Sequence, residues 1–172
     1  MLANEGNRSL LISRYALDGQ PYHTEQIDVT WETCSLRSWL NSTFLNTAFT
    51  ADEQKAIRKT SVDNSTSQRR SNFSTSGGNN TTDRIFLLSY AEAEKYFGSD
   101  SDRICKPTAY AKAQQGYSNP SGNCWWYLRS PGFFQNTAAI VIEDGSLGLS
   151  TDVCYSRFVE AVRPAFWIDL DA

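Results

Sequence analysis

The last quarter of the chain holds the feature that most restricts its fold: two aromatic segments, each containing an Arg and a Pro. Residues 124–132 read CWWYLRSPG, and residues 162–168 read VRPAFWI. Apolar stretches and polar loops alternate between them, as in antiparallel strands joined by turns. Each Arg stands in an apolar run, so each needs carboxylate or carbonyl partners once that run is buried. The pattern predicts a rigid β framework that holds an adaptable surface.

We assign five residues of these segments to the framework, because they are large aromatic side chains or cationic side chains in apolar surroundings. Removal of either Arg would leave its hydrogen-bond partners unsatisfied. The five framework residues are Trp125, Trp126, Arg129, Arg163 and Trp167.

Composition limits the class of protein. The 172 residues suit one domain over residues 1–172, with the hydrophobic (40%) and charged (20%) shares of a globular protein. A net charge of −3 argues against nucleic acid as a partner, since phosphate contacts need a clustered basic face. The Arg69-Arg70 doublet lies among Ser and Asn, as in a solvated loop. No stretch approaches the roughly 20 apolar residues that span a bilayer, so we expect no direct membrane insertion.

The sequence does not identify the cellular compartment of the protein. The first residues contain no apolar core of a signal peptide, and a strand-like run begins almost at once at Ser9. We therefore expect a domain of a longer protein.

Helix signals cluster early in the chain and strand signals late, with a strand at each end. Ser35 and Ser89 are candidate helix N-caps, and Thr50 with Glu53 forms a capping-box pattern. Residues 64–82 are almost entirely polar, apart from Phe73, and predict a long surface loop. The order predicts an α+β fold with short helices in the N-terminal half and an antiparallel, β-rich C-terminal half. Helices are expected at residues 35–49, with a break at Asn41-Ser42, and at residues 90–97 and 108–115, and a further short helix is expected to begin after Thr50. Strands are expected at residues 9–17, 83–89, 125–128, 137–143, 149–153 and 162–170, with a turn at residues 18–21.

The sequence offers little catalytic chemistry. His23 is the only histidine, and no GxSxG pattern accompanies it, so we interpret it as a structural residue. No phosphate loop or cofactor motif is present, and we assign no catalytic residue, cofactor or metal. The four cysteines are far apart, which argues against a zinc site. They form two disulfides or remain buried thiols. Thiols are favoured, because a chain of this length does not need disulfide cross-links for stability.

Five ordered motifs resemble a bacterial domain of unknown function, and they extend over nearly the whole chain from Ser9 onward. They are residues 30–41 (TWETCSLRSWLN), 86–89 (FLLS), 105–111 (CKPTAYA), 124–132 (CWWYLRSPG) and 162–168 (VRPAFWI). This domain is similar to the C-type-lectin-like fold of the formylglycine-generating-enzyme subgroup. Similar domains include the variable proteins of diversity-generating retroelements, whose last loops are varied. Cys154 lies outside the motifs, which marks it as the surface thiol.

The resemblance implies a ligand surface within residues 133–158. The residues themselves agree in kind, because one strand face cannot bury both Phe133 and Phe134, and mixed Tyr, Arg, Phe, Ser and Asn are typical of contact surfaces. The alternative is that these aromatic rings cap the core. The implied surface consists of Phe133, Phe134, Gln135, Asn136, Ser150, Asp152, Tyr155, Ser156, Arg157 and Phe158.

The leading functional expectation is a ligand-binding domain for an unknown protein or other macromolecule. One alternative is an enzyme of the formylglycine-generating type, and another is a structural or interaction domain of a larger surface or phage protein. The calcium-lectin motifs, the closely spaced cysteine pair of the sulfatase-maturing enzymes and the three-histidine set of related iron enzymes are all absent. A shared fold therefore does not predict shared catalysis.

Overall fold

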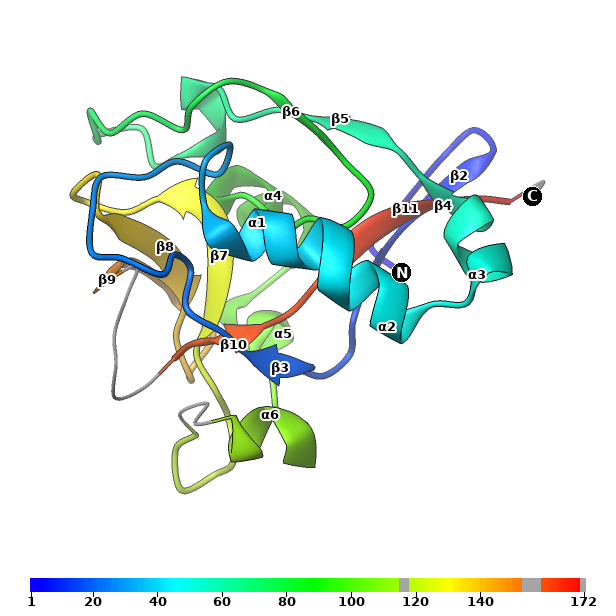
Figure 1. Ribbon diagram of the computed structural model, residues 1–172. Helices are drawn as coiled ribbons and strands as arrows, with labels where there is room; N and C mark the ends of the chain where they lie inside the picture. The colour runs from blue at the N-terminus through cyan, green and yellow to red at the C-terminus, as the bar shows by residue number, and fades with distance from the viewer. Residues whose placement is uncertain (115–117, 153–158, 171–172) are drawn as a thin grey trace.

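The computed structural model describes residues 1–114, 118–152 and 159–170, and of residues 149–152 only the backbone. Within these residues the chain is a mixed α+β structure of three small sheets and short helices (Figure 1). The α+β expectation is confirmed at this level. The helical segments are α1 (Ser35–Trp39), the π-helix η1 (Leu40–Phe44), α2 (Leu45–Ala48), α3 (Ala51–Ala56), the 3₁₀-helix η2 (Thr66–Gln68), α4 (Tyr90–Tyr96), α5 (Asp100–Arg103) and α6 (Ala109–Ala113).

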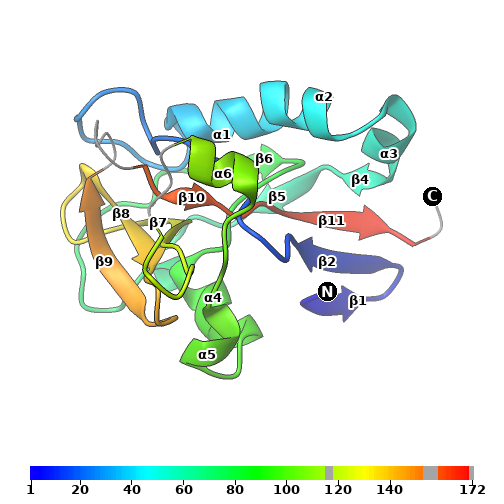
Figure 2. The same cartoon turned by 90° about the horizontal axis from the view of Figure 1, so that it is seen from below.

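The first sheet ties the two ends of the chain together (Figure 2). Its strands are antiparallel and lie in the order β1 (Ala3–Glu5), β2 (Arg8–Ile12), β11 (Ala165–Asp169) and β4 (Ile57–Arg58). The strand predicted over residues 9–17 was too long, because the chain leaves this sheet after Ile12. The amide of Leu17 already donates to the Val162 carbonyl in the second sheet, at 2.9 Å.

The second sheet carries the C-terminal framework. Its order is β3 (Asp18–Gly19), β10 (Ala161–Val162), β7 (Trp126–Pro131), β8 (Thr137–Val141) and β9 (Leu147–Asp152). Its pairs are antiparallel, except that β10 runs parallel to β7. Two predictions were wrong here. Asp18 and Gly19 form a strand instead of a turn, and the expected strand over residues 162–170 divides between two sheets. Pro164 marks the division, because its ring nitrogen has no hydrogen to donate to a ladder.

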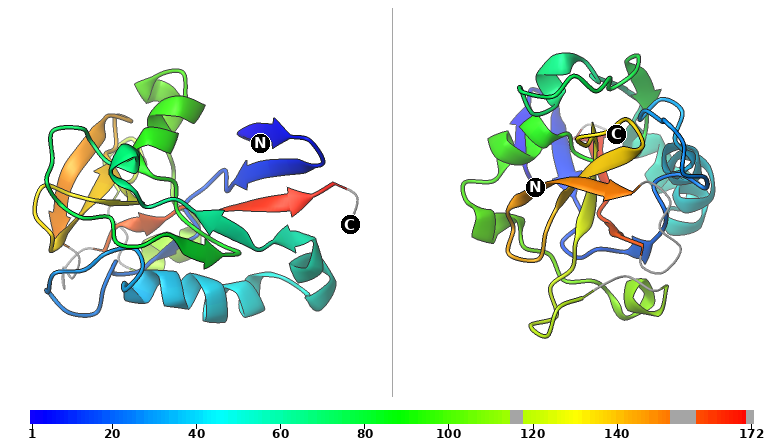
Figure 3. Two further views of the ribbon diagram at one scale, coloured as in Figure 1. Left: turned by 90° about the horizontal axis from the view of Figure 1, so that it is seen from above. Right: turned by 90° about the vertical axis from the view of Figure 1, so that its left-hand side faces the viewer.

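The helix predicted to begin after Ser35 lies along one side of the sheets as the continuous run α1–η1–α2 (Figure 3). Its N-cap is Cys34 and not Ser35, since the Cys34 sulfur accepts from the Arg37 amide at 3.4 Å. The capping box of Thr50 and Glu53 is confirmed at the start of α3, and Ser89 caps α4 as expected. No helix in the described parts of the chain is long and apolar enough to cross a membrane.

Residues 64–82 are not simply a solvated loop, which corrects the sequence interpretation. This segment contains η2 and ends in β6 (Thr81–Asp83), which pairs with β5 (Thr60–Val62). Asn64, Phe73 and Thr75 within it are buried. Polar composition misled the prediction, because the polar side chains satisfy hydrogen bonds inside the fold. The Asn64 side chain, for example, donates to the Asn79 carbonyl at 2.9 Å.

Candidate functional site

The Phe turn, residues 132–137, connects β7 to β8 and carries two phenylalanine rings into solvent. Phe133 is 56% exposed and Phe134 is 60% exposed, and the two rings meet edge to face with centroids 4.8 Å apart. Buried Thr137 closes the turn. Its amide and hydroxyl donate to the Phe134 carbonyl at 3.0 and 2.7 Å, and the Phe134 amide donates to that hydroxyl at 3.0 Å. The backbone beneath the exposed rings is therefore fixed.

Gln135 joins the Phe turn to two distant loops. Its side-chain nitrogen Nε2 donates to the backbone carbonyls of Val29 and Ser76, both at 2.9 Å. Its side-chain oxygen Oε1 accepts from the backbone amide of Ser76 at 2.8 Å. Its own carbonyl accepts from the Val29 amide at 3.2 Å. The Gln135 side chain, which the sequence assigns to the ligand surface, therefore forms hydrogen bonds that hold two loops in place. Asn136 is held through its carbonyl, which accepts from Gln26 at 3.0 Å.

The segment of residues 73–76 supports the Phe turn from beneath. The Phe73 ring is buried and meets Phe133 edge on, with centroids 5.2 Å apart. The Thr75 hydroxyl donates to the Gly132 carbonyl at 3.0 Å. Sequence reasoning missed these two residues as part of the site. The available signal was the single aromatic ring in an otherwise polar run, because an isolated Phe in such a run needs something to cover it.

An open polar groove of about 450 Å³ adjoins the turn, and Gln135 lines both. Its walls come from residues 28–33 and 76–79, which lie at the same end of the molecule as the Phe turn (Figures 1 and 3). Glu32 ties the walls together, because its carboxylate accepts from the Asn79 amide at 3.2 Å and from the Asn79 side chain at 3.0 Å. Exposed Asp28 adds a second carboxylate to the lining.

The other half of the predicted surface is only partly described. The backbone of β9 places Asp152 opposite Thr137, and Thr151 opposite Ala138, so this strand ends beside the Phe turn. Ser150 belongs to the same strand, and the side chains of Ser150 and Asp152 lie outside the description. Tyr155, Ser156, Arg157, Phe158 and Cys154 lie outside the described residues.

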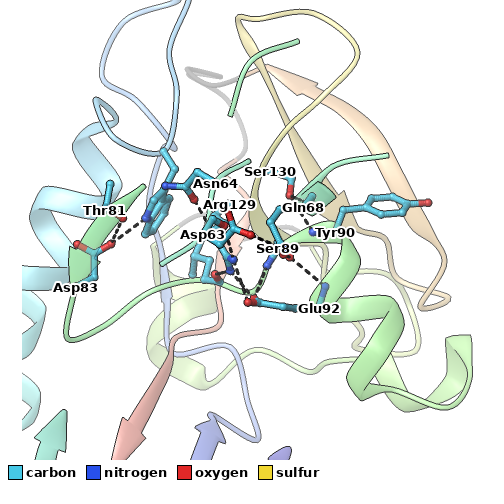
Figure 4. A network of polar contacts seen from close by, with 12 residues as sticks. Asp63, Asn64, Gln68, Thr81, Asp83, Ser89, Tyr90, Glu92, Arg129 and Ser130 are labelled. Atoms are coloured by element: carbon cyan, nitrogen blue, oxygen red, sulfur yellow. Dashed lines mark hydrogen bonds and ion pairs between the residues drawn. The ribbon is translucent and has the colours of Figure 1, made fainter. Parts of the chain in front are cut away.

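Arg129, one of the five residues assigned to the framework, lies in a network of polar contacts (Figure 4). It is 2% exposed, and its guanidinium donates to both carboxylate oxygens of Glu92, in one case at 2.9 Å. It also donates to the carbonyls of Leu87 and Asp63, at 2.9 and 3.0 Å, and to the Asn64 side chain at 3.2 Å. One side chain of β7 therefore fixes α4 and the start of the polar segment against the second sheet.

Comparison with known proteins shows one match, to a protein family. Residues 6–170 match the family described as a domain of unknown function, DUF6273. The chain belongs to this family. The match extends over the Phe turn, the groove and the whole framework. No curated protein and no solved structure matches the chain significantly. Because the family has no assigned activity, its function has to be inferred from the geometry of the site.

The other four residues assigned to the framework are mostly buried. Arg163 is 6% exposed, donates to the Ser13 carbonyl at 2.9 Å, and lies 4.9 Å from the centroid of the Trp126 ring. Burial lowers the pKa of its guanidinium. The Trp126 indole donates to the Arg103 carbonyl at 3.1 Å. Trp167 is buried in β11, whereas Trp125 is half-buried and its indole donates to Glu143.

The described cysteines, Cys34, Cys105 and Cys124, are buried free thiols, in agreement with the favoured expectation. Burial raises the pKa of Cys34 to about 12. Cys105 and Cys124 are far apart in the sequence but face each other in an antiparallel bridge. A hydrogen bond from Cys124, with Arg163 nearby, lowers the pKa of the Cys105 thiol. Among the described residues, no group of three His, Cys, Asp or Glu side chains is placed to hold a metal ion.

The remaining candidates of the sequence have structural roles. His23 accepts from the Ser35 amide at 3.1 Å through Nδ1, which matches its interpretation as a structural residue. Arg70 is exposed, as expected for a solvated loop, whereas Arg69 is half-buried. Among the described residues, the arrangement best placed to contact a partner is therefore the exposed, fixed Phe turn beside the polar groove.

Proposed function

We propose that this chain is a non-catalytic ligand-binding domain that presents the Phe turn and the adjoining groove to a protein or other macromolecule. The observation that carries the proposal is the exposure of Phe133 and Phe134 on a backbone fixed by Thr137 and Gln135. Covering such rings by a partner contributes about 1.5–3 kcal/mol for each fully buried side chain. The fixed turn keeps the entropic cost of binding low.

The shape of the surface favours a macromolecule over a small metabolite. Small ligands bind in concave sites that enclose most of their surface. Here the two rings project outward, and the groove beside them is open and polar. Ile27 is a further exposed apolar residue (47%) near the Phe turn. The side chain of its neighbour Gln26 donates to the carbonyl of Asn136 in that turn. Exposed aromatic anchors with a polar surround are typical of protein contact surfaces.

We extend the proposal to the resemblance drawn from the sequence, a C-type-lectin-like domain whose residues 133–158 form a diversified surface. The support is that β8 and β9 bring residues 137 and 152 of this range side by side, since Asp152 pairs with Thr137. Sequencing the locus in related strains tests this part. Substitutions concentrated in the codons for residues 133–136 and 150–158, beside a reverse transcriptase and an imperfect repeat, support it. Substitutions spread evenly over the gene refute it.

Photo-crosslinking tests the binding function itself. A photoreactive phenylalanine analogue is placed at position 134 of the full protein in the cells that produce it. The same analogue at Tyr15, which is 45% exposed, serves as the matched control. We expect one macromolecule to be linked from position 134 and not from position 15. Equal, weak labelling from both positions argues against a ligand surface at the Phe turn.

The second candidate function is an enzyme of the formylglycine-generating type, and one observation favours it. Cys105 and Cys124 lie opposite each other, and the pKa of Cys105 is lowered. Both thiols are buried, at 2% and 0% exposure, which limits access of a substrate. Stoichiometric copper or iron in the purified protein, or thiol-dependent oxidation of a substrate peptide, would favour this candidate over the binding domain.

A further inference from the structure

A second pocket, which shares no lining residue with the Phe turn or its groove, lies between the α1–η1–α2 run and α6. Its volume is about 410 Å³, within the usual range for small-molecule sites. Figure 1 shows β3 between these helical segments, and β3 supplies the inner wall of the pocket through Asp18. Trp39, Phe44 and Tyr110 are the aromatic residues of its lining.

Two of the three aromatic rings in the lining pack against each other. The rings of Trp39 and Phe44 lie 5.3 Å apart, tilted by 43°. Tyr110, on α6, is 59% exposed, although it lines the pocket. Phe44 belongs to the π-helix η1, and such π-helical turns occur frequently at functional sites. Aromatic faces arranged around a cavity attract cations, because the ring quadrupole places negative charge on the face.

Asp18 supplies the charge that such a ligand would need. It is 7% exposed, and its Oδ1 accepts from the Gly19 amide at 2.8 Å and from the Gln20 side chain at 3.4 Å. Among the described residues it forms no ion pair, and no group donates a hydrogen bond to Oδ2. Burial raises its pKa. Oδ2 reaches solvent at the pocket, so it is open to a cation that enters there. The low polarity of the aromatic lining would strengthen the ion pair between them.

We propose that this pocket binds a small organic cation, a primary or quaternary ammonium compound, between the aromatic rings and the Asp18 carboxylate. A smaller, mainly apolar pocket continues from it and shares Gln20 and Trp39 with it. The extension has room for a short aliphatic tail, with Leu36 and Pro21 in its lining. The ligand class is therefore an ammonium head group on a short apolar chain.

Titration of the whole protein with choline, followed by the indole N–H resonance of Trp39, tests the proposal. The resonance is assigned by its loss in Trp39→Phe. We expect saturable shifts at millimolar choline, and at least about tenfold weaker binding of the uncharged isostere whose quaternary nitrogen is replaced by carbon. A short primary alkylamine forms the second arm and decides which ammonium type is preferred. Absence of saturable shifts with both cations, or equal binding of the neutral isostere, overturns the proposal.

Two substitutions and one control separate binding from folding. Asp18→Asn keeps an oxygen for the Gly19 and Gln20 hydrogen bonds, so we expect a folded protein that binds choline about tenfold more weakly or worse. Tyr110→Ala should weaken choline binding severalfold, whereas Tyr15→Ala, an exposed tyrosine elsewhere, should leave it unchanged. Unchanged binding in Asp18→Asn refutes the site. Strong destabilisation of Asp18→Asn also refutes it, because Asp18 would then already be paired within the chain.

Discussion

Phe133 lies edge on against Phe73, with ring centroids 5.2 Å apart, although 60 residues separate the two in the sequence. One ring is more than half exposed and the other is buried. The exposed Phe turn is thus supported by Phe73, which belongs to the polar segment of residues 64–82. Phe133 and Phe134 are therefore the rings available to contact a partner, and Phe73 is the buried ring that supports them.

The first prediction separates these two roles by stability. Phe73→Ala removes a buried ring, so we expect the free energy of unfolding to fall by about 3 kcal/mol. Phe134→Ala removes an exposed ring, and we expect a loss of less than about 1 kcal/mol. Urea unfolding followed by circular dichroism measures both values. A loss above about 2 kcal/mol in Phe134→Ala would show that the ring belongs to the core.

The second prediction concerns Arg129, whose guanidinium is bound by Glu92 and by two carbonyls. A lysine cannot reproduce its planar set of donors. We expect Arg129→Lys to lower the free energy of unfolding by about 3 kcal/mol or more, because buried acceptors lose their partners. Arg84 is exposed, and Arg84→Lys is the matched control, with an expected change within about 0.5 kcal/mol. Similar small effects of both substitutions would contradict the framework role.

The third prediction is the pH dependence that Asp18 imposes on stability. Burial raises its pKa in the folded state above that of the unfolded chain. Between these two pKa values the folded protein holds more protons than the unfolded chain, so stability falls as pH rises through this interval. Asp18→Asn abolishes this effect. We expect the variant to gain stability relative to the wild type as the pH is raised above about 4, the usual pKa of an Asp side chain in an unfolded chain, as measured by urea unfolding. A stability difference independent of pH contradicts the assignment.

The fourth prediction concerns thiol reactivity. Cys34 is 1% exposed and burial raises its pKa to about 12, so it has little thiolate at neutral pH. We expect a thiol reagent to modify Cys34 only as fast as the protein unfolds. Cys154, which the sequence assigns to the surface, should react at once, and Cys154→Ser should remove this rapid phase. Rapid labelling of Cys34 in the folded protein, located by mass spectrometry, would be inconsistent with its burial.

The sequence predicted the local elements better than their connections. Capping residues such as Thr50 and Ser89 act through neighbours three positions away, so their patterns were readable. Arg129 was also recognised, because a cation in an apolar run needs buried partners. Its particular partners, Glu92 and the carbonyls of Leu87 and Asp63, come from segments whose approach only the tertiary fold decides.

The candidate site shows the same division. The adjacency of Phe133 and Phe134 indicated that one strand face could not bury both, since neighbouring residues point to opposite faces of a strand. Both rings are in fact exposed, because they lie in the turn between β7 and β8. The role of Gln135 could not be predicted in this way, because Val29 and Ser76 are its partners only once two loops converge. Asp18 was taken as a turn residue, and its pairing with Val162 depends on a strand at the other end of the chain.

The affinity of the crosslinked partner for purified variants tests the central claim most directly. Isothermal titration would compare the wild type with Phe133→Ala, Phe134→Ala and the control Tyr15→Ala. We predict that at least one of the two Phe substitutions raises Kd by about 30-fold or more, as expected for an aromatic anchor, while Tyr15→Ala leaves Kd unchanged. An unchanged Kd in the folded double variant Phe133→Ala/Phe134→Ala would contradict the account.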